Sequence, residues 1–287
     1  MLPKPHSVKV AQTIPELDKI LDPYRQKQQN VGFVPTMGAL HEGHISLIKQ
    51  AKAENEVVVC SIFVNPTQFN DPADLKRYPR PVEEDKQMLE AAGCDVLFLP
   101  TVEVMYPKGD FTTLNEDFGM LDKVMEGASR PGHFAGMITV VNKLLLAVKP
   151  INAYFGQKDF QQLAIVKHFI AKHVIPINII GCPIVREPDG LAMSSRNRLL
   201  SPDERKRAVL ISQTLFKVKE MWGKSSVADI KDFVQNEFVK DGYMKLDYFE
   251  ISYSDTLQPF DGKRNAQAVA CIAVFDGKVR LIDNILL

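Results

Sequence analysis

Two histidines stand three residues apart in the string PTMGALHEGH, residues 35–44, which we call the HEGH loop. His41 and His44 occupy positions that share one face of a helical turn, and Gly43 lies between them. Imidazole donates hydrogen bonds to phosphate oxygens and stabilises charge that develops there. A glycine lets a flat base or a ribose approach the main chain closely. The loop therefore predicts a site for a nucleotide phosphate.

A lysine and a serine–arginine stretch supply further groups that suit phosphate. Lys158 follows Gly156 and opens a predicted helix, so its ammonium group and the helix N-terminus both suit a triphosphate. Asp159 is either the N-cap of that helix or a ligand contact. Residues 193–197, MSSRN, combine two hydroxyls with the guanidinium of Arg196. This combination predicts a phosphate clamp, and a solvated basic loop is the alternative.

Two glutamines and an arginine–histidine pair suit other parts of a substrate. Gln68 and Gln162 are neutral and can both donate and accept hydrogen bonds, which suits hydroxyl groups better than phosphate. Exposed glutamines without a ligand are the alternative. Arg130 and His133 flank a Pro-Gly pair that could aim both at a carboxylate or a phosphate. A salt bridge within a dimer is the alternative for this pair.

Other patterns in the sequence point away from chemistry. The acidic run Glu83, Glu84 and Asp85 predicts an exposed helix face, with indirect help to magnesium as the alternative. The HEGH spacing does not match the HExxH of zinc proteases. The sequence contains neither a GxxxxGK[ST] phosphate loop nor a GxGxxG fingerprint.

The composition is that of a soluble globular protein with one or two domains. The chain has 287 residues, and its 35 basic and 35 acidic residues give a formal net charge of zero. No global attraction to nucleic acid or to an anionic membrane follows. The start, MLPKPHSVKV, lacks an apolar signal-peptide core, and the apolar run 57–64 is too short to cross a bilayer.

The four cysteines are scattered and form no CxxC pair. We interpret them as reduced thiols of a cytoplasmic protein, without a disulfide framework or a zinc site.

The order of strand and helix patterns predicts an α/β fold. Apolar runs alternate with helical patterns, so we expect a Rossmann-like, doubly wound parallel sheet with helices on both faces. Thr13 and Glu16 predict a capping box at the first helix. Residues 65–81, rich in Pro, Asn, Asp and Gln, predict a long functional loop. We expect helices over residues 14–29, 45–54, 82–92, 133–148 and 159–173, and strands over 31–34, 57–64, 95–99, 153–155 and 177–185.

The pattern changes near residue 184, which predicts a second, smaller domain. Two amphipathic helices over 202–222 and 227–240 precede strands over 247–253, 268–275 and 278–283, with a tight Asp276-Gly277 turn between the last two. We expect residues 1–183 to form the nucleotide- and substrate-binding domain and residues 184–287 an α+β lid domain.

The HEGH loop resembles the nucleotidyltransferase superfamily, which attacks the α-phosphate of ATP, and within it the pantothenate synthetase (pantoate–β-alanine ligase) family. The resemblance covers nearly the full chain. One departure is Gln157, where many members have Glu. The other matching stretches are SIFVNPTQF (61–69), RYPR (77–80), EGASRPGHFAG (126–136), FGQKDFQQL (155–163), DGLAMSSRN (189–197) and RLIDN (280–284).

This resemblance implies that ATP drives the joining of pantoate to β-alanine through a pantoyl adenylate, with release of pyrophosphate and AMP. It implies that Gln68 and Gln162 hold the hydroxyls of pantoate, that residues 193–197 close over ATP, and that the protein is a homodimer. Residues that match the nucleotide-binding pattern are Met37, Gly38, Ala39, Leu40, His41, Glu42, Gly43, His44, Gly156, Gln157, Lys158, Asp159, Val185, Met193, Ser194, Ser195 and Arg196.

Each of these groups then has an expected role. His44, followed by His41, stabilises phosphate charge, and Lys158 and Arg196 neutralise the leaving pyrophosphate. Arg130 and His133 join the glutamines in binding the substrate. Mg²⁺ rides on the ATP phosphates, and no protein ligand is assigned to it.

Two other functions remain as alternatives. One is an adenylyl-transferring enzyme with a different acid or nucleotide substrate, which would need groups for a second phosphate where Gln68 and Gln162 stand. The other is a regulatory protein that binds a nucleotide without turnover. In such a protein we would expect the loss of one or more of four residues, namely His41, His44, Lys158 and Arg196.

Overall fold

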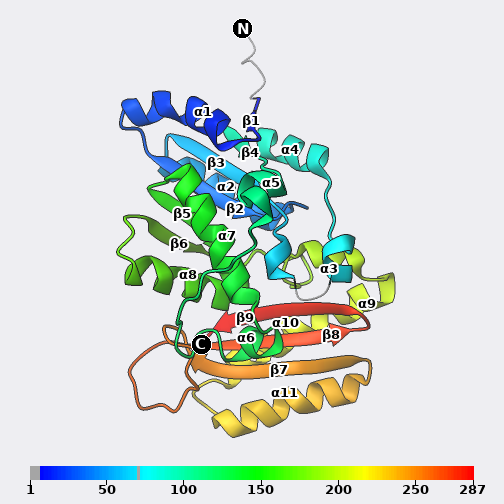
Figure 1. The fold of residues 1–287 in the computed structure, drawn as a ribbon. Coiled ribbons are helices and arrows are strands. Elements are labelled where there is room, and N and C mark those ends of the chain that lie inside the picture. The colour runs from blue at the N-terminus through cyan, green and yellow to red at the C-terminus, as the bar shows by residue number, and fades with distance from the viewer. Residues whose placement is uncertain (1–6, 70–71) are drawn as a thin grey trace. The chain divides into compact units, whose positions relative to one another are not determined.

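The computed structural model describes residues 7–69 and 72–287, which pack as two compact units (Figure 1). The first contains the residues before Gly119 together with Arg130–Gln157 and Ile165–Cys182. The second contains Gly119–Ser129, Lys158–Ala164 and Pro183–Leu287. The domain boundary at residues 183 and 184 and the lid role stay predictions. The packing units differ from those domains because residues 119–129 and 158–164 join the C-terminal part.

A parallel sheet forms the centre of the first unit, as expected, and residues 9–11 add a sixth strand to the five that were predicted (Figure 1). Every residue of β3 (Val57–Ile62) is buried. Both faces of that strand are therefore covered, which explains its unbroken apolar sequence. The other strands are β1 (Lys9–Ala11), β2 (Val31–Thr36), β4 (Val96–Phe98), β5 (Asn152–Gly156) and β6 (Asn178–Cys182).

The strand order β1-β4-β3-β2-β5-β6 confirms a doubly wound topology. The chain builds outward from β2 through β3 to β4 on one side and from β5 to β6 on the other. The order therefore reverses between β2 and β5, and ligands of such sheets bind beyond the carboxyl ends of the strands at this point. The HEGH loop leaves the end of β2 there, and Gly156 ends β5.

Helices of the first unit begin close to the predicted residues. The capping box of Thr13 and Glu16 is confirmed, but α1 (Ile14–Gln26) ends three residues before the predicted Gln29, because Gln28 adopts a φ of 54°. The other helices of the first unit before residue 150 are α2 (Glu42–Glu54), α3 (Pro72–Arg77), α4 (Val82–Ala91), α5 (Val102–Met105) and α7 (His133–Val148), with 3-10 turns η1 (Pro66–Gln68) and η2 (Pro107–Gly109).

The predicted long loop over residues 65–81 is wrong in part, because η1 and α3 lie within it. Residues 70–71 of that segment lie outside the described residues. After β5 the chain continues through η3 (Gln157–Asp159) and α8 (Phe160–Lys172). Helix α2 packs on β2, β3 and β5, whereas α7 packs on β2 and η1.

All four cysteines are buried free thiols. Burial raises the pKa of Cys94 to about 12 and that of Cys182 to about 11. These thiols therefore stay protonated near neutral pH and are poor nucleophiles.

The second unit is built on an antiparallel sheet of β7 (Met244–Tyr253), β8 (Ala268–Asp276) and β9 (Val279–Leu286), as its strand pattern predicted. Asp276 pairs with Val279 across the predicted tight turn, and Gly277 takes the positive φ of 57° that this turn requires. The remaining elements are α6 (Met125–Ser129), η4 (Ser195–Leu199), α9 (Pro202–Arg207), α10 (Val209–Met221) and α11 (Val227–Asp241).

Two helices cover this sheet and complete an apolar core. Helix α10 packs on β8 and β9, and α11 packs on β7 (Figure 1). The single helix predicted over residues 202–222 is instead two helices, α9 and α10, joined at the buried Ala208. Within the described ranges, no helix is long and apolar enough to cross a membrane.

Candidate active site

The HEGH loop begins with a tight turn that is held by the side chain of Thr36. Thr36 Oγ1 donates to the carbonyl oxygen of Ser61 at 2.8 Å and accepts from the Gly38 N–H at 3.1 Å. Gly38 has a φ of 79°, and a Cβ there would come within 2.9 Å of Ile62 Cγ2. Only glycine meets both conditions without strain, so the glycine of the motif shapes the turn.

A buried carboxylate from another helix anchors the next two residues of the loop. Asp85 on α4 is 1% exposed, and its two oxygens accept the main-chain N–H groups of Ala39 at 2.8 Å and Leu40 at 2.7 Å. The expectation that Asp85 belongs to an exposed helix face is therefore wrong. Its neighbours Glu83 and Glu84 are exposed, as that expectation required. Helix α4 turns one carboxylate of the run inward, and the loop supplies the donors that make its burial tolerable.

Most N–H groups of the HEGH loop donate within the protein. Besides Gly38, Ala39 and Leu40, the Gly43 N–H donates to His41 Nδ1 at 3.1 Å and the His44 N–H to the His41 carbonyl oxygen at 2.8 Å. These N–H groups therefore already have acceptors within the protein.

The two imidazoles lie side by side at the start of α2, as their spacing predicted. Their ring centroids are 4.1 Å apart, and both side chains are half-buried. His41 is the N-cap of α2. Because its Nδ1 accepts a hydrogen bond, the proton of the neutral ring lies on Nε2, which can donate to an anion. Glu42, the first residue of α2, is exposed.

Gln68 ends η1 and lies among buried polar groups. Its Nε2 donates to Met37 Sδ at 3.0 Å, and its Oε1 accepts from Asn65 Nδ2 at 3.2 Å. Asn65 is fully buried, and its Oδ1 accepts from the hydroxyl of Tyr106 at 2.7 Å. Burial raises the pKa of Tyr106, which keeps the phenol protonated as the donor. Nothing in the sequence indicated that Asn65 and Tyr106 would hold the Gln68 amide in this way.

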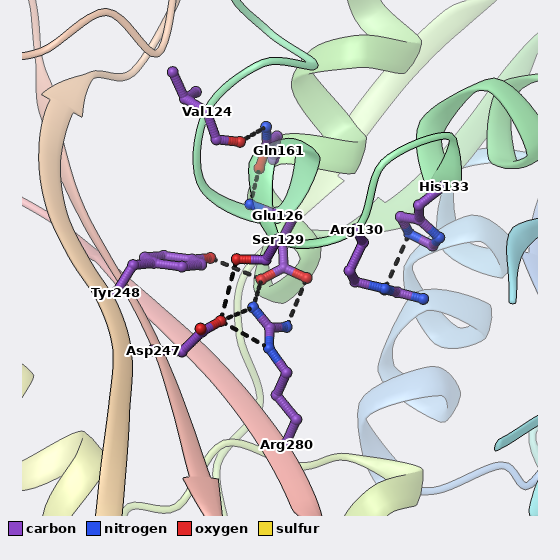
Figure 2. Close-up of polar contacts among 9 residues, drawn as sticks. All are labelled: Val124, Glu126, Ser129, Arg130, His133, Gln161, Asp247, Tyr248 and Arg280. Atoms are coloured by element: carbon purple, nitrogen blue, oxygen red, sulfur yellow. Dashed lines mark hydrogen bonds and ion pairs between the residues drawn. The ribbon is translucent and has the colours of Figure 1, made fainter. Parts of the chain in front are cut away.

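Arg130 and His133 hold the main chain of Gln68. His133 Nδ1 donates to the Gln68 carbonyl oxygen at 2.7 Å, and an Arg130 nitrogen lies 3.3 Å from the same oxygen. Arg130 also contacts His133 Nε2 at 3.2 Å (Figure 2). A guanidinium only donates, so His133 Nε2 accepts and the proton lies on Nδ1. The predicted contact of this pair with substrate stays a prediction.

Gly136 lets α7 approach η1 closely, and its replacement is a test of that approach. A Cβ at this position would lie 2.2 Å from the main-chain oxygen of Thr67. In an open helix Gly136→Ala would stabilise the protein by about 1 kcal/mol. Here we expect the overlap to reverse the sign and lower the free energy of unfolding by about 1–3 kcal/mol.

Urea unfolding of the Gly136→Ala variant measures this effect. The control is Leu146→Ala, a substitution at an exposed position of the same helix. A more stable Gly136→Ala protein would show that the contact between α7 and η1 is looser than described.

The other residues that we predicted to bind phosphate or a substrate hydroxyl belong to the second unit. Lys158 lies in η3 and Gln162 in the first turn of α8, and both side chains are partly buried. Asn284 Nδ2 donates to the Lys158 carbonyl oxygen at 2.9 Å. Gln157 lies beside Lys158 and is partly buried, whereas Asp159 is exposed. The choice between N-cap and ligand contact for Asp159 stays open.

The stretch before η4 is ordered by main-chain contacts. The Met193 N–H donates to the Val185 carbonyl oxygen at 3.0 Å, next to a bridge between Arg186 and Ala192. Ser194 caps η4 by accepting from the Arg196 N–H at 3.2 Å. Ser195 is buried and Arg196 is half-buried, so residues 193–197 form an ordered turn that packs against the protein.

An ion cluster around the buried Glu126 ties α6 to the second sheet (Figure 2). Arg280 binds Glu126 through two nitrogens at 2.7 and 2.8 Å and Asp247 at 2.8 Å. The Tyr248 hydroxyl donates to Glu126 at 2.9 Å. Burial acts to lower the pKa of Arg280, but the hydrogen bonds with Glu126 outweigh it and raise that pKa. A β-bulge at Asp247 explains how two successive residues of β7 reach one cluster.

Gln161 extends this cluster to α8. Its Nε2 donates to the Leu121 carbonyl oxygen at 2.6 Å. The same nitrogen donates to the Val124 carbonyl oxygen at 2.9 Å, and Gln161 Oε1 accepts from the Glu126 N–H at 3.0 Å (Figure 2). Gln161 therefore has a structural role, because both ends of its amide bind the main chain of residues 121–126. The adjacent Gln162 is partly buried and stays the residue predicted to bind pantoate.

The described side chains do not form a site that could hold a metal ion by protein ligands alone. Across residues 7–69 and 72–287, no group of three or more His, Cys, Asp or Glu side chains is arranged to hold one. A Mg²⁺ ion that arrives with ATP keeps phosphate and water ligands, so it would fit here without such a group.

A family model and individual relatives indicate the same family. The model of a family described as pantoate-beta-alanine ligase matches residues 9–286. A pantothenate synthetase of Bacteroides fragilis is 50% identical over 279 residues, which cover 97% of this chain and 98% of the relative.

Solved structures agree with this result. A pantothenate synthetase from Thermus thermophilus is 42% identical with a TM-score of 0.90, over 97% of this chain and 99% of that chain. A pantoate-beta-alanine ligase from Francisella tularensis, described as complexed with "Beta-gamma ATP and Beta-alanine", is 40% identical with a TM-score of 0.81, over 98% of each chain.

Proposed function

The chain belongs to the pantoate–β-alanine ligase family, and on that premise we propose how its residues join pantoate to β-alanine at the expense of ATP. The observation that carries the proposal is the pair of imidazoles, His41 and His44, at the carboxyl end of β2 beside the switch point of the sheet. This is the position at which a doubly wound sheet binds its ligands.

The reaction proceeds in two steps. A carboxylate oxygen of pantoate attacks the α-phosphorus of ATP, and the bond to the β-phosphate oxygen breaks with release of pyrophosphate. The amine of β-alanine then attacks the acyl carbon of pantoyl adenylate, loses a proton, and displaces AMP. No covalent bond to the protein forms, so catalysis consists of alignment and of stabilising charge on phosphate.

The HEGH loop stabilises the charge on the α-phosphate. His44 is the principal donor to the phosphate oxygens, and His41 adds its Nε2–H, since its Nδ1 already accepts from Gly43. Asp85 holds the loop by two main-chain hydrogen bonds, so the rings have a fixed base. The rest of residues 37–44 lies against the nucleotide, with Gly43 giving room for its approach.

Residues of the second unit neutralise the triphosphate. Lys158 supplies a point charge and Arg196 a planar fork of donors, assisted by the hydroxyls of Ser194 and Ser195. Gly156, Gln157, Asp159, Val185 and Met193 complete the predicted nucleotide contacts. A Mg²⁺ ion carried by the ATP phosphates would offset part of their negative charge.

Pantoate is held by the two glutamines. The amide of Gln68 is oriented by Met37 and Asn65, which supports its role as a fixed partner for a hydroxyl. Gln162 provides the second amide. Arg130 and His133 hold the main chain of Gln68 by hydrogen bonds to its carbonyl oxygen. We assign to them, in addition, a direct contact with the carboxylate of the substrate.

Gln162→Ala tests the assignment of pantoate to these amides. We expect the KM for pantoate to rise about three- to tenfold, which corresponds to one lost hydrogen bond, with the KM for ATP nearly unchanged. Gln213→Ala, an exposed glutamine of α10, is the matched control. A larger effect on ATP than on pantoate would refute the assignment.

A mass-resolved assay tests the function as a whole. Incubation with ATP, pantoate and β-alanine should give AMP and pantothenate in equal amounts, and pyrophosphate release should require pantoate. Pyrophosphate release without pantoate would favour a different adenylyl acceptor. ATP binding without AMP formation would favour a regulatory protein.

We also propose a cytoplasmic homodimer that has neither nucleic acid nor membrane as a partner. Four free thiols support the reducing compartment, and family membership supports the dimer. Sedimentation at micromolar concentration measures the oligomeric state, and a monomer there would contradict the dimer.

A further inference from the structure

The RLIDN stretch of β9, residues 280–284, holds three segments of the second unit that are distant in sequence, yet the proposed function gives it no role. Arg280 binds Glu126, Asp283 binds Arg186, and Asn284 binds the main chain of Lys158. The contacts of Arg280 and Asn284 explain why residues 119–129 and 158–164 pack with the C-terminal sheet.

Asp283 anchors the stem of the 193–197 turn. Its two oxygens bind the two terminal nitrogens of Arg186 at 2.7 and 3.0 Å, and its side chain is 2% exposed. Burial raises the pKa of Asp283, and the bonds from Arg186 oppose that rise. Arg186 forms a bridge with Ala192, the residue that precedes Met193. The position of this carboxylate therefore fixes where the turn begins.

Asn284 fixes the main chain of Lys158. Its Nδ2 donates to the Lys158 carbonyl oxygen at 2.9 Å, and its own N–H donates to Asp283 Oδ1 at 2.8 Å. Asn284 is 4% exposed, so this contact is shielded from water. A lysine side chain is long and flexible, so the reach of its ammonium group depends on where its main chain is held.

We propose that Asp283 and Asn284 are positioning residues for nucleotide binding. Together they link Lys158 and the stem of the 193–197 turn to one strand, β9, so that the main chains that carry Lys158 and Arg196 are held by the same element. This inference rests on the proposed function, in which Lys158 and Arg196 bind the triphosphate. Neither Asp283 nor Asn284 needs to touch the substrate.

Steady-state kinetics of Asn284→Ala test the proposal. We expect the KM for ATP to rise about three- to tenfold, the worth of one neutral hydrogen bond, and kcat to fall. The KM for β-alanine should stay within about twofold of the wild-type value. An unchanged KM for ATP in a folded variant would overturn the proposal.

A second variant separates the hydrogen bond from packing. Asn284→Leu nearly keeps the volume of the side chain and adds no charge, but it has no donor for the Lys158 carbonyl oxygen. Positioning predicts a rise in the KM for ATP at least as large as in Asn284→Ala. A role in packing alone predicts nearly wild-type kinetics for Asn284→Leu, which would also overturn the proposal. This variant keeps the test decisive if alanine prevents folding.

Two further variants complete the design. Asp283→Asn keeps the shape but weakens the bond to Arg186, and it should also raise the KM for ATP. Val234→Ala truncates a fully buried core residue of α11 in the same unit, and it should lower the thermal midpoint without changing that KM. If Val234→Ala raises the KM for ATP as much as Asn284→Ala does, general loosening explains both and the positioning role fails.

The wild-type protein separates this proposal from the function on which it rests. If the wild type forms no AMP and pantothenate, the proposed function fails and the positioning role fails with it. If the wild type forms both products and the Asn284 variants match its KM for ATP, only the positioning role fails.

Discussion

Replacing His44 by alanine is expected to lower kcat about a hundredfold or more, which is the loss typical of a group that stabilises developing charge. The half-buried ring lies 4.1 Å from that of His41, measured between centroids, and both flank the start of α2. His41 remains in the variant and should preserve part of the stabilisation. The measurement is steady-state formation of AMP, with circular dichroism to confirm that the variant is folded.

A matched histidine shows whether the effect is specific. His168→Ala removes an exposed imidazole of α8, and its kcat should stay close to that of the wild type. His44→Asn, which keeps one N–H donor, should recover part of the lost rate. Near-normal activity of His44→Ala would remove His44 from the mechanism.

Replacing Asp85 by asparagine is expected to impair both stability and turnover. The amide keeps the shape of the carboxylate, but its nitrogen cannot accept one of the two N–H groups that Ala39 and Leu40 now donate. We expect the free energy of unfolding to fall by about 1.5–3 kcal/mol, the worth of a hydrogen bond to a charged group. A loop shift of about 1 Å would in addition lower kcat up to a hundredfold.

Glu83→Gln is the control for Asp85→Asn, because it removes the same charge from an exposed position of the same helix. It should change the free energy of unfolding by less than about 0.5 kcal/mol. Chemical denaturation and AMP formation measure both variants. If Asp85→Asn behaved like Glu83→Gln, the carboxylate would not anchor the loop.

Features that depend on neighbouring residues were predictable from the sequence. The apolar run of β3 and the capping box of Thr13 and Glu16 are local patterns, and both are confirmed. The pairing of His41 with His44 also follows from spacing alone. Helix ends were less predictable, because a single main-chain choice such as the positive φ of Gln28 decides them.

Contacts between distant residues were not predictable in this way. Asp85 lies 45 residues from Leu40, so nothing near either residue reveals that one carboxylate of an acidic run turns inward. The β-bulge at Asp247 has no sequence pattern of its own, yet it brings Asp247 and Tyr248 to one cluster. Asn65 and Tyr106 are 41 residues apart and escaped notice for the same reason.

The long reach of β9 has a consequence for how the chain matures on the ribosome. Arg280 follows its partner Glu126 by 154 residues, and Asn284 follows Lys158 by 126. The parallel sheet can form while β9 is still untranslated, but Glu126 and the Lys158 main chain must wait for their partners. A nascent chain stalled before residue 280 should therefore carry a formed first unit and be unable to retain ATP until translation resumes.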